Sequence, residues 1–561
     1  MGFWTKTTRM LLPLTLSISF LAACSNAGTN GPTNQVEPSN TPATNVEATE
    51  EAKPFTKYDP PVEISGAIVL RDNAKLLYDD TAEDNPISRW AEETIGIKTK
   101  YKWLLADEGD ALNQKIRLAM ASGEELPDVL FVADTVVLNE LMESGMIEPI
   151  DEAYEKYATE RMRTTYDAKP EVWNIVSKDG QRWGLPQVAK GPSIVGDPVM
   201  WVRQDWLDAV GLPAPTTIEE FEAVLAAFKE TYPDKLPMAF SGKDYLSAWM
   251  ADASFLFGKD QILQWNLGDD GKLQYGSVQP YVKKGLQKLN EWYTKGYIDP
   301  EFGTIDPNKA AGQFASGDAG IVFGPPWMGG WPLGDTLVNA PDSVVKAYPV
   351  PSSVDGIKGH KGSYATYGAF VFRKGFDKWE GVFKYFDATL GRTILDENSE
   401  FANGYAEGYD YVMVDGKPVW KDNPGAVNKS SISSYLLLNA GGISAGYDEN
   451  GKSMYERVAE GSRANVYEQQ IAELNGSLFI EGHLAAGKQV DTAYSHQFLA
   501  APTPTMAEKW TLLSKTEVET MLKIVYGRVG LDEFDKFVDE WYAKGGEQIT
   551  KEVNEWYTSV K

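Results

Sequence analysis

Short apolar runs alternate with segments of helical spacing in the first part of the chain. Residues 67–70 (AIVL) have the length of a strand, and residues 87–94 show a helical pattern of apolar positions. Residues 111–121 predict another helix, and residues 127–132 predict the next strand. This alternation is typical of an α/β fold with a largely parallel sheet, whose ligands bind at the carboxyl ends of the strands.

Asp134 follows the end of the second predicted strand. A carboxylate in that position can accept hydrogen bonds from the hydroxyl groups of a ligand. Aspartates at strand ends also cap the following helix, so the sequence leaves both uses open for Asp134.

Lys6 and Arg9 precede an apolar run at residues 10–20, and the small residues Ala22 and Ala23 follow it. This order is typical of an export signal, and the run is too short to span a bilayer. Residues 21–24 (LAAC) resemble the lipobox of bacterial lipoproteins. The resemblance implies cleavage before Cys24 and attachment of a diacylglycerol to its sulfur. The alternative is an ordinary secretory signal with an incidental cysteine near the cleavage site.

Residues 25–60 are rich in Asn, Thr, Pro, Gly, Ala and Glu, with almost no large apolar residue before Phe55. Such a segment cannot bury enough apolar surface to offset the entropy lost on ordering. We therefore expect a flexible stalk. No later apolar run is long enough to predict a transmembrane helix.

The length and composition of the remaining chain predict an acidic protein with two lobes. Roughly 500 residues follow the stalk, which exceeds the size at which one hydrophobic core keeps growing. The contents of 43% hydrophobic and 24% charged residues are ordinary for a globular protein. The formal net charge of -27 argues against a nucleic-acid partner, because phosphate binding needs basic surface.

Residues that commonly bind metal ions form no recognisable site. The chain has one cysteine and three histidines, His360, His483 and His496, which lack ligand spacing. Residues 269–271 (DDG) and 448–451 (DENG) do not complete a calcium-loop pattern, so we expect hairpin turns there. Neither a metal ion nor a cofactor is expected.

Aromatic residues are abundant, since 17 Trp, 27 Tyr and 22 Phe make up 12% of the chain. Many of them stand beside Gly, Pro or Asp in predicted loops. We expect most of them in the core, and a minority in loops to offer the flat apolar faces on which sugar rings stack.

A series of short motifs is spread over the chain after the stalk. They are residues 121–129 (ASGEELPDV), 183–186 (WGLP), 201–207 (WVRQDWL), 211–213 (GLP), 317–327 (GDAGIVFGPPW), 404–411 (GYAEGYDY) and 547–557 (EQITKEVNEWY). In this order they resemble the extracellular solute-binding proteins that deliver sugars to ABC importers, and especially the large lipoprotein branch of that family. The resemblance covers essentially the whole chain after the stalk.

The resemblance implies a periplasmic-binding-protein-like fold of type II, in which two α/β lobes close on a ligand. We expect the N-terminal lobe at residues 61–190 and 353–430, and the C-terminal lobe at residues 191–352 and 431–561. Segments with little helical periodicity are expected to cross between the lobes near residues 187–198, 349–356 and 429–435.

Residues 324–331 (GPPWMGGW) are the most suggestive stretch for a binding site. They follow the predicted strand 319–323, so Trp327 and Trp331 would emerge at its carboxyl end on a glycine-rich loop. The resemblance implies that a tryptophan at this position stacks on a pyranose ring. The alternative is that Trp327 or Trp331 fills the core of the lobe.

Further aromatic candidates lie in two other loops. Tyr245 and Trp249 have i,i+4 spacing, which would put both on one helix face and is also the spacing of core residues. A core position is the favoured interpretation of Trp249. Tyr364 and Tyr367 stand beside the predicted strand 369–372 and could form the opposite wall of the site.

Arg203 is the basic candidate, because it lies within one of the motifs shared with the relatives. Its guanidinium could hold a ligand or pair with Asp205. The ion pair is the favoured interpretation.

The resemblance implies a binding protein without catalytic activity that captures an oligosaccharide and delivers it to the permease subunits of an ABC transporter. We expect a monomer without nucleic acid, held by its lipid at the extracellular face of the cytoplasmic membrane. A glycoside hydrolase is the alternative, because it needs only two facing carboxylates and carboxylates are abundant. No HExxH helix is present in the sequence. A surface lipoprotein that binds carbohydrate without transport is a further alternative, whereas the hinge pattern disfavours a purely structural lipoprotein.

Overall fold

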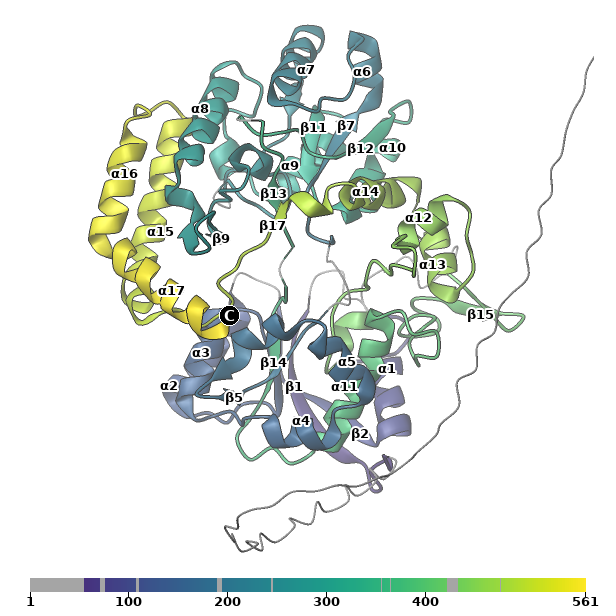
Figure 1. Ribbon diagram of the computed structural model, residues 1–561. Helices are drawn as coiled ribbons and strands as arrows, with labels where there is room; N and C mark the ends of the chain where they lie inside the picture. The colour runs from purple at the N-terminus through teal and green to yellow at the C-terminus, as the bar shows by residue number, and fades with distance from the viewer. Residues whose placement is uncertain are drawn as a thin grey trace, which may run out of the picture. The chain divides into compact units, whose positions relative to one another are not determined.

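The computed structural model describes residues 55–70, 76–106, 110–188, 194–243, 246–354, 356–363, 365–420, 432–474 and 476–561. Within this part of the chain, two sheets flanked by helices form two lobes (Figure 1). This confirms the predicted two-lobe α/β architecture. The predicted export signal, Cys24 and most of the predicted stalk lie outside the described residues, as do Tyr245 and Tyr364.

The N-terminal lobe contains a five-stranded sheet in the order β2-β1-β3-β14-β6. Its strands are β1 (Val62–Leu70), β2 (Ile97–Ala106), β3 (Val129–Val132), β6 (Leu185–Pro186) and β14 (Ala369–Phe372). Strands β1, β2 and β3 are parallel, while β14 runs antiparallel to both β3 and β6. The strand predicted at residues 67–70 is therefore the last part of a longer strand.

Helices flank this sheet, and the first two lie where the spacing of apolar residues predicts them. They are α1 (Pro86–Trp90), α2 (Ala111–Ser122), α3 (Thr135–Ser144), α4 (Asp151–Tyr157), α5 (Glu160–Asp167) and α11 (Trp379–Thr393). The Asn85 side chain accepts N–H groups at the start of α1, and Gly123 ends α2 in the left-handed conformation that glycine adopts without strain. A small hairpin, β4 (Ser177–Lys178) and β5 (Gln181–Arg182), lies between α5 and β6.

The C-terminal lobe contains a four-stranded sheet in the order β12-β7-β11-β8. Its strands are β7 (Val199–Arg203), β8 (Leu236–Met238), β11 (Ala319–Gly324) and β12 (Val345–Tyr348). Strand β11 is parallel to β8 and antiparallel to β7. All six residues of β11 are buried, as expected for a central strand covered on both faces.

The helices of the C-terminal lobe come from two distant parts of the chain. They are α6 (Gln204–Val210), α7 (Ile218–Thr231), α8 (Pro280–Thr294), α9 (Pro307–Ala315), α10 (Thr336–Asn339), α12 (Met454–Ala459), α13 (Val466–Leu474), α14 (Ser477–Gly487), α15 (Pro504–Val525), α16 (Glu533–Trp541) and α17 (Glu547–Val560). None of the helices in the described part of the chain is long and apolar enough to cross a membrane.

Each lobe has its own hydrophobic core, and large aromatic side chains fill both. Trp201, Trp265, Trp292 and Trp541 are almost completely buried in the C-terminal lobe. This confirms that most of the aromatic excess serves packing. The DDG turn predicted at residues 269–271 is a true hairpin turn, because it connects β9 (Trp265–Leu267) to the antiparallel β10 (Leu273–Tyr275).

The chain passes between the two sheets more than once. It leaves the N-terminal sheet after Pro186 and enters the C-terminal sheet at Val199, and it returns between Tyr348 and Ala369. The third passage differs from the prediction of residues 429–435. Residues 432–440 still pack in the core of the N-terminal lobe, through side chains that include Leu438, so the chain leaves that lobe later.

Candidate functional site

Two tryptophans lie together at the carboxyl end of β11. The loop after β11 carries Trp327, and the backbone N–H of Ala251 donates to the carbonyl of Phe323 at 2.7 Å, which brings the Trp249 loop to the same place. The two indole rings stack with centroids 5.6 Å apart and an interplanar angle of 23°. Trp249 is 46% exposed and Trp327 is half-buried. The core interpretation of Trp249 is therefore wrong.

The helix suggested for the Trp249 loop does not form. Residues 246–253 are turns and bends, and Leu246 and Ala251 have positive φ angles. Long-range backbone bonds hold the loop instead, since Ser241 donates its N–H to the carbonyl of Ala251 at 2.8 Å. Tertiary contacts therefore override the i,i+4 spacing that predicted a helix face.

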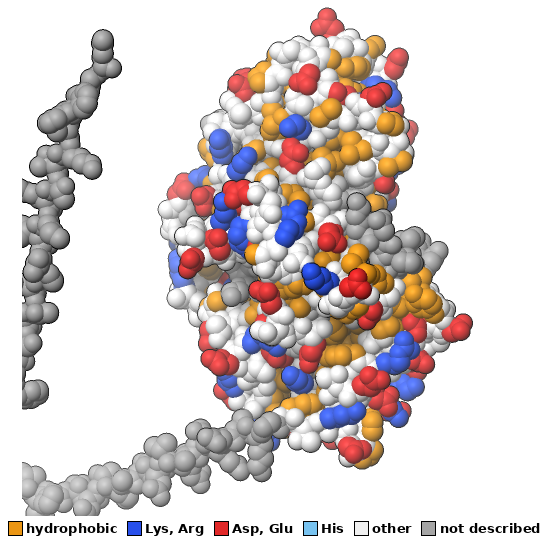
Figure 2. Space-filling view, turned by 90° about the vertical axis from the view of Figure 1, so that its right-hand side faces the viewer, with side chains coloured by type: hydrophobic (Ala, Val, Ile, Leu, Met, Phe, Trp, Pro, Cys, Tyr) orange, Lys and Arg blue, Asp and Glu red, His pale blue; other side chains and the backbone are white. Residues whose placement is uncertain are grey.

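A pocket of about 440 Å³ opens beside these rings, and we call it the tryptophan pocket. It is lined by Trp327, Gly329, Gly330, Trp331, Gly334, Leu337, Leu474, Gly476, Ser477, Leu478 and Phe479. Trp331 is 52% exposed, so it does not fill the core of the lobe. Hydrophobic side chains also gather between scattered charged ones on the upper part of the face shown in Figure 2, which belongs to this lobe.

The start of α14 forms one wall of the tryptophan pocket, and sequence reasoning missed it. A Cβ on Gly329 would lie 2.5 Å from the carbonyl oxygen of Leu478, so only glycine lets the two backbones approach this closely. The pocket thus combines two segments that stand about 150 residues apart in the sequence. The run of small residues around Trp327 is the signal of this close approach.

In the N-terminal lobe, Asp134 and Tyr367 lie at the carboxyl end of β3. Ala369 pairs with Val132, the last residue of β3, so Tyr367 just before β14 is placed at the same end of the sheet as Asp134. Asp134 Oδ1 accepts the N–H groups of Val136 and Val137 at 2.8 and 3.1 Å and thereby caps α3. Tyr367 is 49% exposed.

The two crossing segments meet around one buried carboxylate. Ser363 donates both its N–H and its hydroxyl to Asp197 Oδ1 at 2.7 Å, and Gly196 donates its N–H to the Ser363 hydroxyl at 2.9 Å. The Asp197 side chain is 1% exposed, and His360 Nε2 lies 3.6 Å from its second oxygen. The first and second crossings are therefore bonded to each other.

Arg203 lies away from these groups. It pairs with Val345 at the far end of β7, whereas Val199 at the near end of β7 pairs with Gly324. Its guanidinium donates to both carboxylate oxygens of Asp205, at 2.9 and 2.6 Å. The ion-pair interpretation of Arg203 is confirmed, and the structure does not bring Arg203 together with the other candidates.

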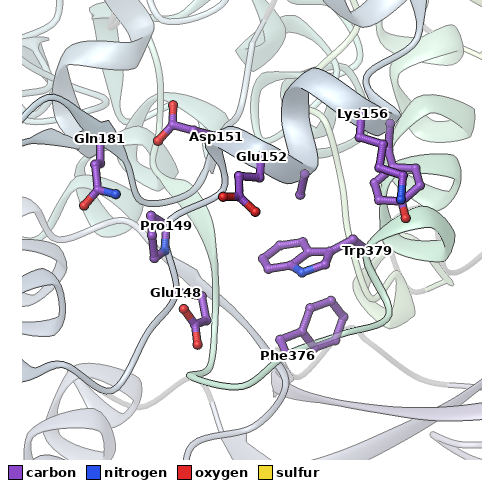
Figure 3. A pocket seen from close by; sticks show the side chains of 10 residues that line it. Glu148, Pro149, Asp151, Glu152, Lys156, Gln181, Phe376 and Trp379 are labelled. Atoms are coloured by element: carbon purple, nitrogen blue, oxygen red, sulfur yellow. The ribbon is translucent and has the colours of Figure 1, made fainter. Parts of the chain in front are cut away.

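A second pocket, of about 500 Å³, lies in the N-terminal lobe, and we call it the far-edge pocket (Figure 3). Phe376 and Trp379 lie on one side of it, and Glu148 and Pro149 on the other. Its lining also includes Asp151, Glu152, Ala153, Lys156, Tyr157 and Gln181. Phe372, which precedes Phe376, pairs with Val129 at the start of β3, so this pocket is at the amino end of the parallel strands.

Polar groups of the far-edge pocket are largely engaged within the protein. Arg182 donates from Nε to Asp151 Oδ1 at 2.7 Å, and Gly375 donates its N–H to Glu148 Oε1 at 2.6 Å. The Trp379 ring packs on Phe372 and Phe376, with both pairs of centroids 4.9 Å apart. These contacts give the far-edge pocket a structural role.

A third pocket, of about 500 Å³, lies where residues of both lobes meet. Lys169 and Glu171 of the N-terminal lobe and Trp556 and Tyr557 of α17 are among its lining residues. Burial lowers the pKa of Lys169, whereas the neighbouring Glu171 opposes that shift. This pocket therefore lies between α17 and the N-terminal lobe.

The comparisons with known proteins agree with this architecture. Residues 74–375 match the family model described as bacterial extracellular solute-binding protein. Lipoprotein LipO of Bacillus subtilis is 21% identical over 503 residues, covering 87% of this chain and 92% of LipO. The polygalacturonan/rhamnogalacturonan-binding protein YtcQ of the same bacterium is 22% identical over 474 residues, which cover 81% of this chain and 84% of YtcQ.

A solved structure shares the fold over nearly the same length. The ABC-transporter substrate-binding protein FusA of Streptococcus pneumoniae, in complex with kestose, has a TM-score of 0.61 at 17% sequence identity. The match covers 89% of this chain and 100% of FusA. Since the family match alone spans more than half of the residues, this chain belongs to the bacterial extracellular solute-binding proteins.

Proposed function

We propose that this chain is the oligosaccharide-binding component of an ABC importer. The observation that carries the proposal is the group of accessible indoles, Trp249, Trp327 and Trp331, at the carboxyl end of β11. Indole faces are the surfaces on which sugar rings stack, and α/β sheets bind ligands at this end of their strands. FusA was solved with kestose, and YtcQ is named for binding polygalacturonan and rhamnogalacturonan, which supports a carbohydrate ligand.

The N-terminal lobe would supply the opposite wall. Asp134 uses Oδ1 to cap α3, and no described residue donates to Oδ2, which can accept a sugar hydroxyl. Tyr367 lies at the same end of the sheet, and we assign Tyr245 and Tyr364 to the site with it on sequence alone. Residues 61–190 and 353–430, together with residues 432–440 that pack in the same core, would move against the C-terminal lobe when the ligand binds.

A hydrolase would need two carboxylates on opposite sides of the sugar bond. No described residue of the tryptophan pocket is a carboxylate. The far-edge pocket has carboxylates, but it lies at the amino end of β3. The chemistry of the pockets thus favours binding without turnover.

The protein would act outside the cell as a lipid-anchored monomer that hands its ligand to a permease. The anchor would be Cys24, and the relative LipO carries the name of a lipoprotein. Cell fractionation of Cys24→Ser tests the anchor. We expect the variant in the medium, and a variant still attached to cells would place the anchor elsewhere.

A screen of oligosaccharides tests the proposal as a whole. A ligand that binds only the folded protein raises its stability by RT ln(1 + [L]/Kd), so a binding oligosaccharide should raise the melting temperature. Solution scattering should then show compaction, and chromatography should return the ligand intact. Release of shorter sugars would indicate a hydrolase, and an unchanged radius with saturating ligand would contradict closure of the lobes.

A further inference from the structure

The lining of the tryptophan pocket contains no charged side chain among the residues that the structure describes. Its members are Trp, Phe, Leu, Gly and Ser. The far-edge pocket of similar size is lined by Glu148, Asp151, Glu152 and Lys156. The lack of charge is thus a property of this pocket and not of pockets in this protein generally.

We propose that the tryptophan pocket takes an uncharged sugar, so that the ligand of this protein is a neutral oligosaccharide and not an oligouronate. This inference rests on the proposed function and narrows its ligand class. A sugar carboxylate in the pocket would lose part of its hydration and would find no cationic side chain among the described lining residues. Because Trp331 and Leu337 are about half exposed, this loss would weaken affinity by about tenfold or more.

The start of α14 is the one positive influence that the described lining offers. The helix begins at Ser477, and no side chain caps it. A helix N-terminus of this kind favours an anion by only about two- to fivefold in affinity when it is accessible to solvent. That gain is smaller than the penalty on an unpaired carboxylate. The same N–H groups can donate to the hydroxyl oxygens of a neutral sugar.

Lys361 reaches the neighbouring Trp249 loop, but its ammonium group already interacts with groups of that loop. Lys361 Nζ donates to the carbonyl of Ala248 at 2.8 Å and lies 3.6 Å from the carboxylate of Asp252. The Lys361 side chain is only 15% exposed. At longer range, the formal net charge of -27 repels a polyanionic ligand.

Matched sugar pairs test the inference. In α-1,4-galactotriose and α-1,4-trigalacturonate, the linkage and ring configuration are the same, and only the hydroxymethyl group is replaced by a carboxylate. The pair β-1,4-mannotriose and β-1,4-trimannuronate has the same relation. Calorimetric titration of the full chain measures the affinity for both members of each pair, so that the effect of the charge is seen with the ring shape unchanged. Kestose, cellotriose and xylotriose are titrated as further neutral oligosaccharides.

We expect at least one neutral oligosaccharide to bind, and its acidic counterpart to bind at least about tenfold more weakly. An acidic member that binds as tightly as its neutral counterpart would overturn the inference and leave the proposed function standing. If no oligosaccharide binds, the proposed function fails and the inference falls with it. The two failures are therefore distinguishable.

A variant with an added positive charge in the pocket provides a second test, in which the expected result is tighter and not weaker binding of an acidic sugar. Leu337 lines the tryptophan pocket and is 43% exposed, so Leu337→Lys can add an ammonium there without opening a cavity. We expect trigalacturonate to bind about tenfold more tightly to Leu337→Lys than to the uncharged control Leu337→Gln at low salt, with the difference reduced at high salt. Equal affinities of the two variants would contradict the assignment of the charge-free pocket to the sugar.

Discussion

The tryptophan pocket and the far-edge pocket are similar in volume, at about 440 and 500 Å³, and each contains tryptophan. They differ in position, because one lies at the carboxyl end of β11 and the other at the amino end of β3. They also differ in charge, because only the far-edge pocket is lined by carboxylates and a lysine. Size and aromatic content therefore do not distinguish these two pockets.

The tryptophans of the two regions differ in how tightly they are packed. Trp379 is held by Phe372 and Phe376, so its ring supports the N-terminal lobe. Trp331 and Trp249 expose about half of their surface, at 52% and 46%. A cluster of exposed indoles is the kind of apolar patch that marks a ligand-binding site, which is why we propose the carboxyl end of β11 as the sugar site.

Replacement of Trp379 should have the largest effect on stability and none on binding. Trp379→Ala removes a ring packed on two phenylalanines and should lower the free energy of unfolding by about 2 to 4 kcal/mol. Denaturant unfolding measures the loss, and calorimetry should show unchanged affinity for the oligosaccharide. A weakened affinity in a folded Trp379→Ala protein would remove the distinction between the two pockets.

Replacement of Trp327 should weaken ligand binding more than it lowers stability. Trp327→Ala deletes the stacking face and should weaken binding by about 1 to 3 kcal/mol, while the free energy of unfolding changes less than in Trp379→Ala. Titration beside a thermal melt separates the two quantities. Retained affinity with a loss of about 3 to 5 kcal/mol of stability would make Trp327 a core residue and Trp331 the leading candidate.

A pH series tests whether the tryptophan pocket is uncharged, and it requires that the pH dependence of stability be measured separately from that of affinity. Burial raises the pKa of Glu517 to about 7, and the Tyr275 hydroxyl donates to its Oε2 at 2.9 Å. Because this pKa is raised above the ordinary value of 4.5, the stabilising contribution is full below about pH 4.5 and is lost as the pH rises through about 7. Glu517→Gln should therefore be more stable than the native chain at pH 8, by about 1 to 2 kcal/mol.

Binding to an uncharged pocket should not follow that pH dependence. In both proteins we expect the affinity for a neutral oligosaccharide to stay constant from pH 6 to pH 8. Thermal melts and titrations at each pH measure the two responses. An affinity that changes with pH in Glu517→Gln would indicate a titrating group at the sugar.

The smallest effect is expected at Glu152, an exposed carboxylate of the far-edge pocket. Glu152→Gln should change the free energy of unfolding by less than about 0.5 kcal/mol and leave oligosaccharide affinity unchanged. A tenfold loss of affinity would move the sugar site to the far-edge pocket. Calorimetric titration beside the native chain makes the comparison.

Local pattern was sufficient for much of the fold. Strand β14 (Ala369–Phe372) lies where its apolar run predicts, and so does β11 with the tryptophans after it. Both segments are short, apolar and bounded by turn residues, so their own sequence determines their structure. The carboxyl end of β11 in turn indicates where we propose that a ligand binds.

The missed features depend on contacts between distant residues. The Trp249 loop is not helical because its backbone bonds to Ser241 and Phe323, which neither spacing nor propensity reveals. Leu478 and Phe479 enter the tryptophan pocket only through the close approach of Gly329. The absence of charged side chains from the described lining of this pocket depends on which distant segments meet there, so the sequence alone could not predict it.

The bonds between Asp197, Ser363 and Gly196 affect how the lobes can move. Two separate linkers would allow the lobes to slide, twist and bend independently. Because the two crossings are cross-linked at one buried carboxylate, sliding or twisting them apart would break hydrogen bonds of 2.7 to 2.9 Å, whereas bending them together would not. The proposed closure of the lobes would therefore be a rotation about an axis near this cross-link.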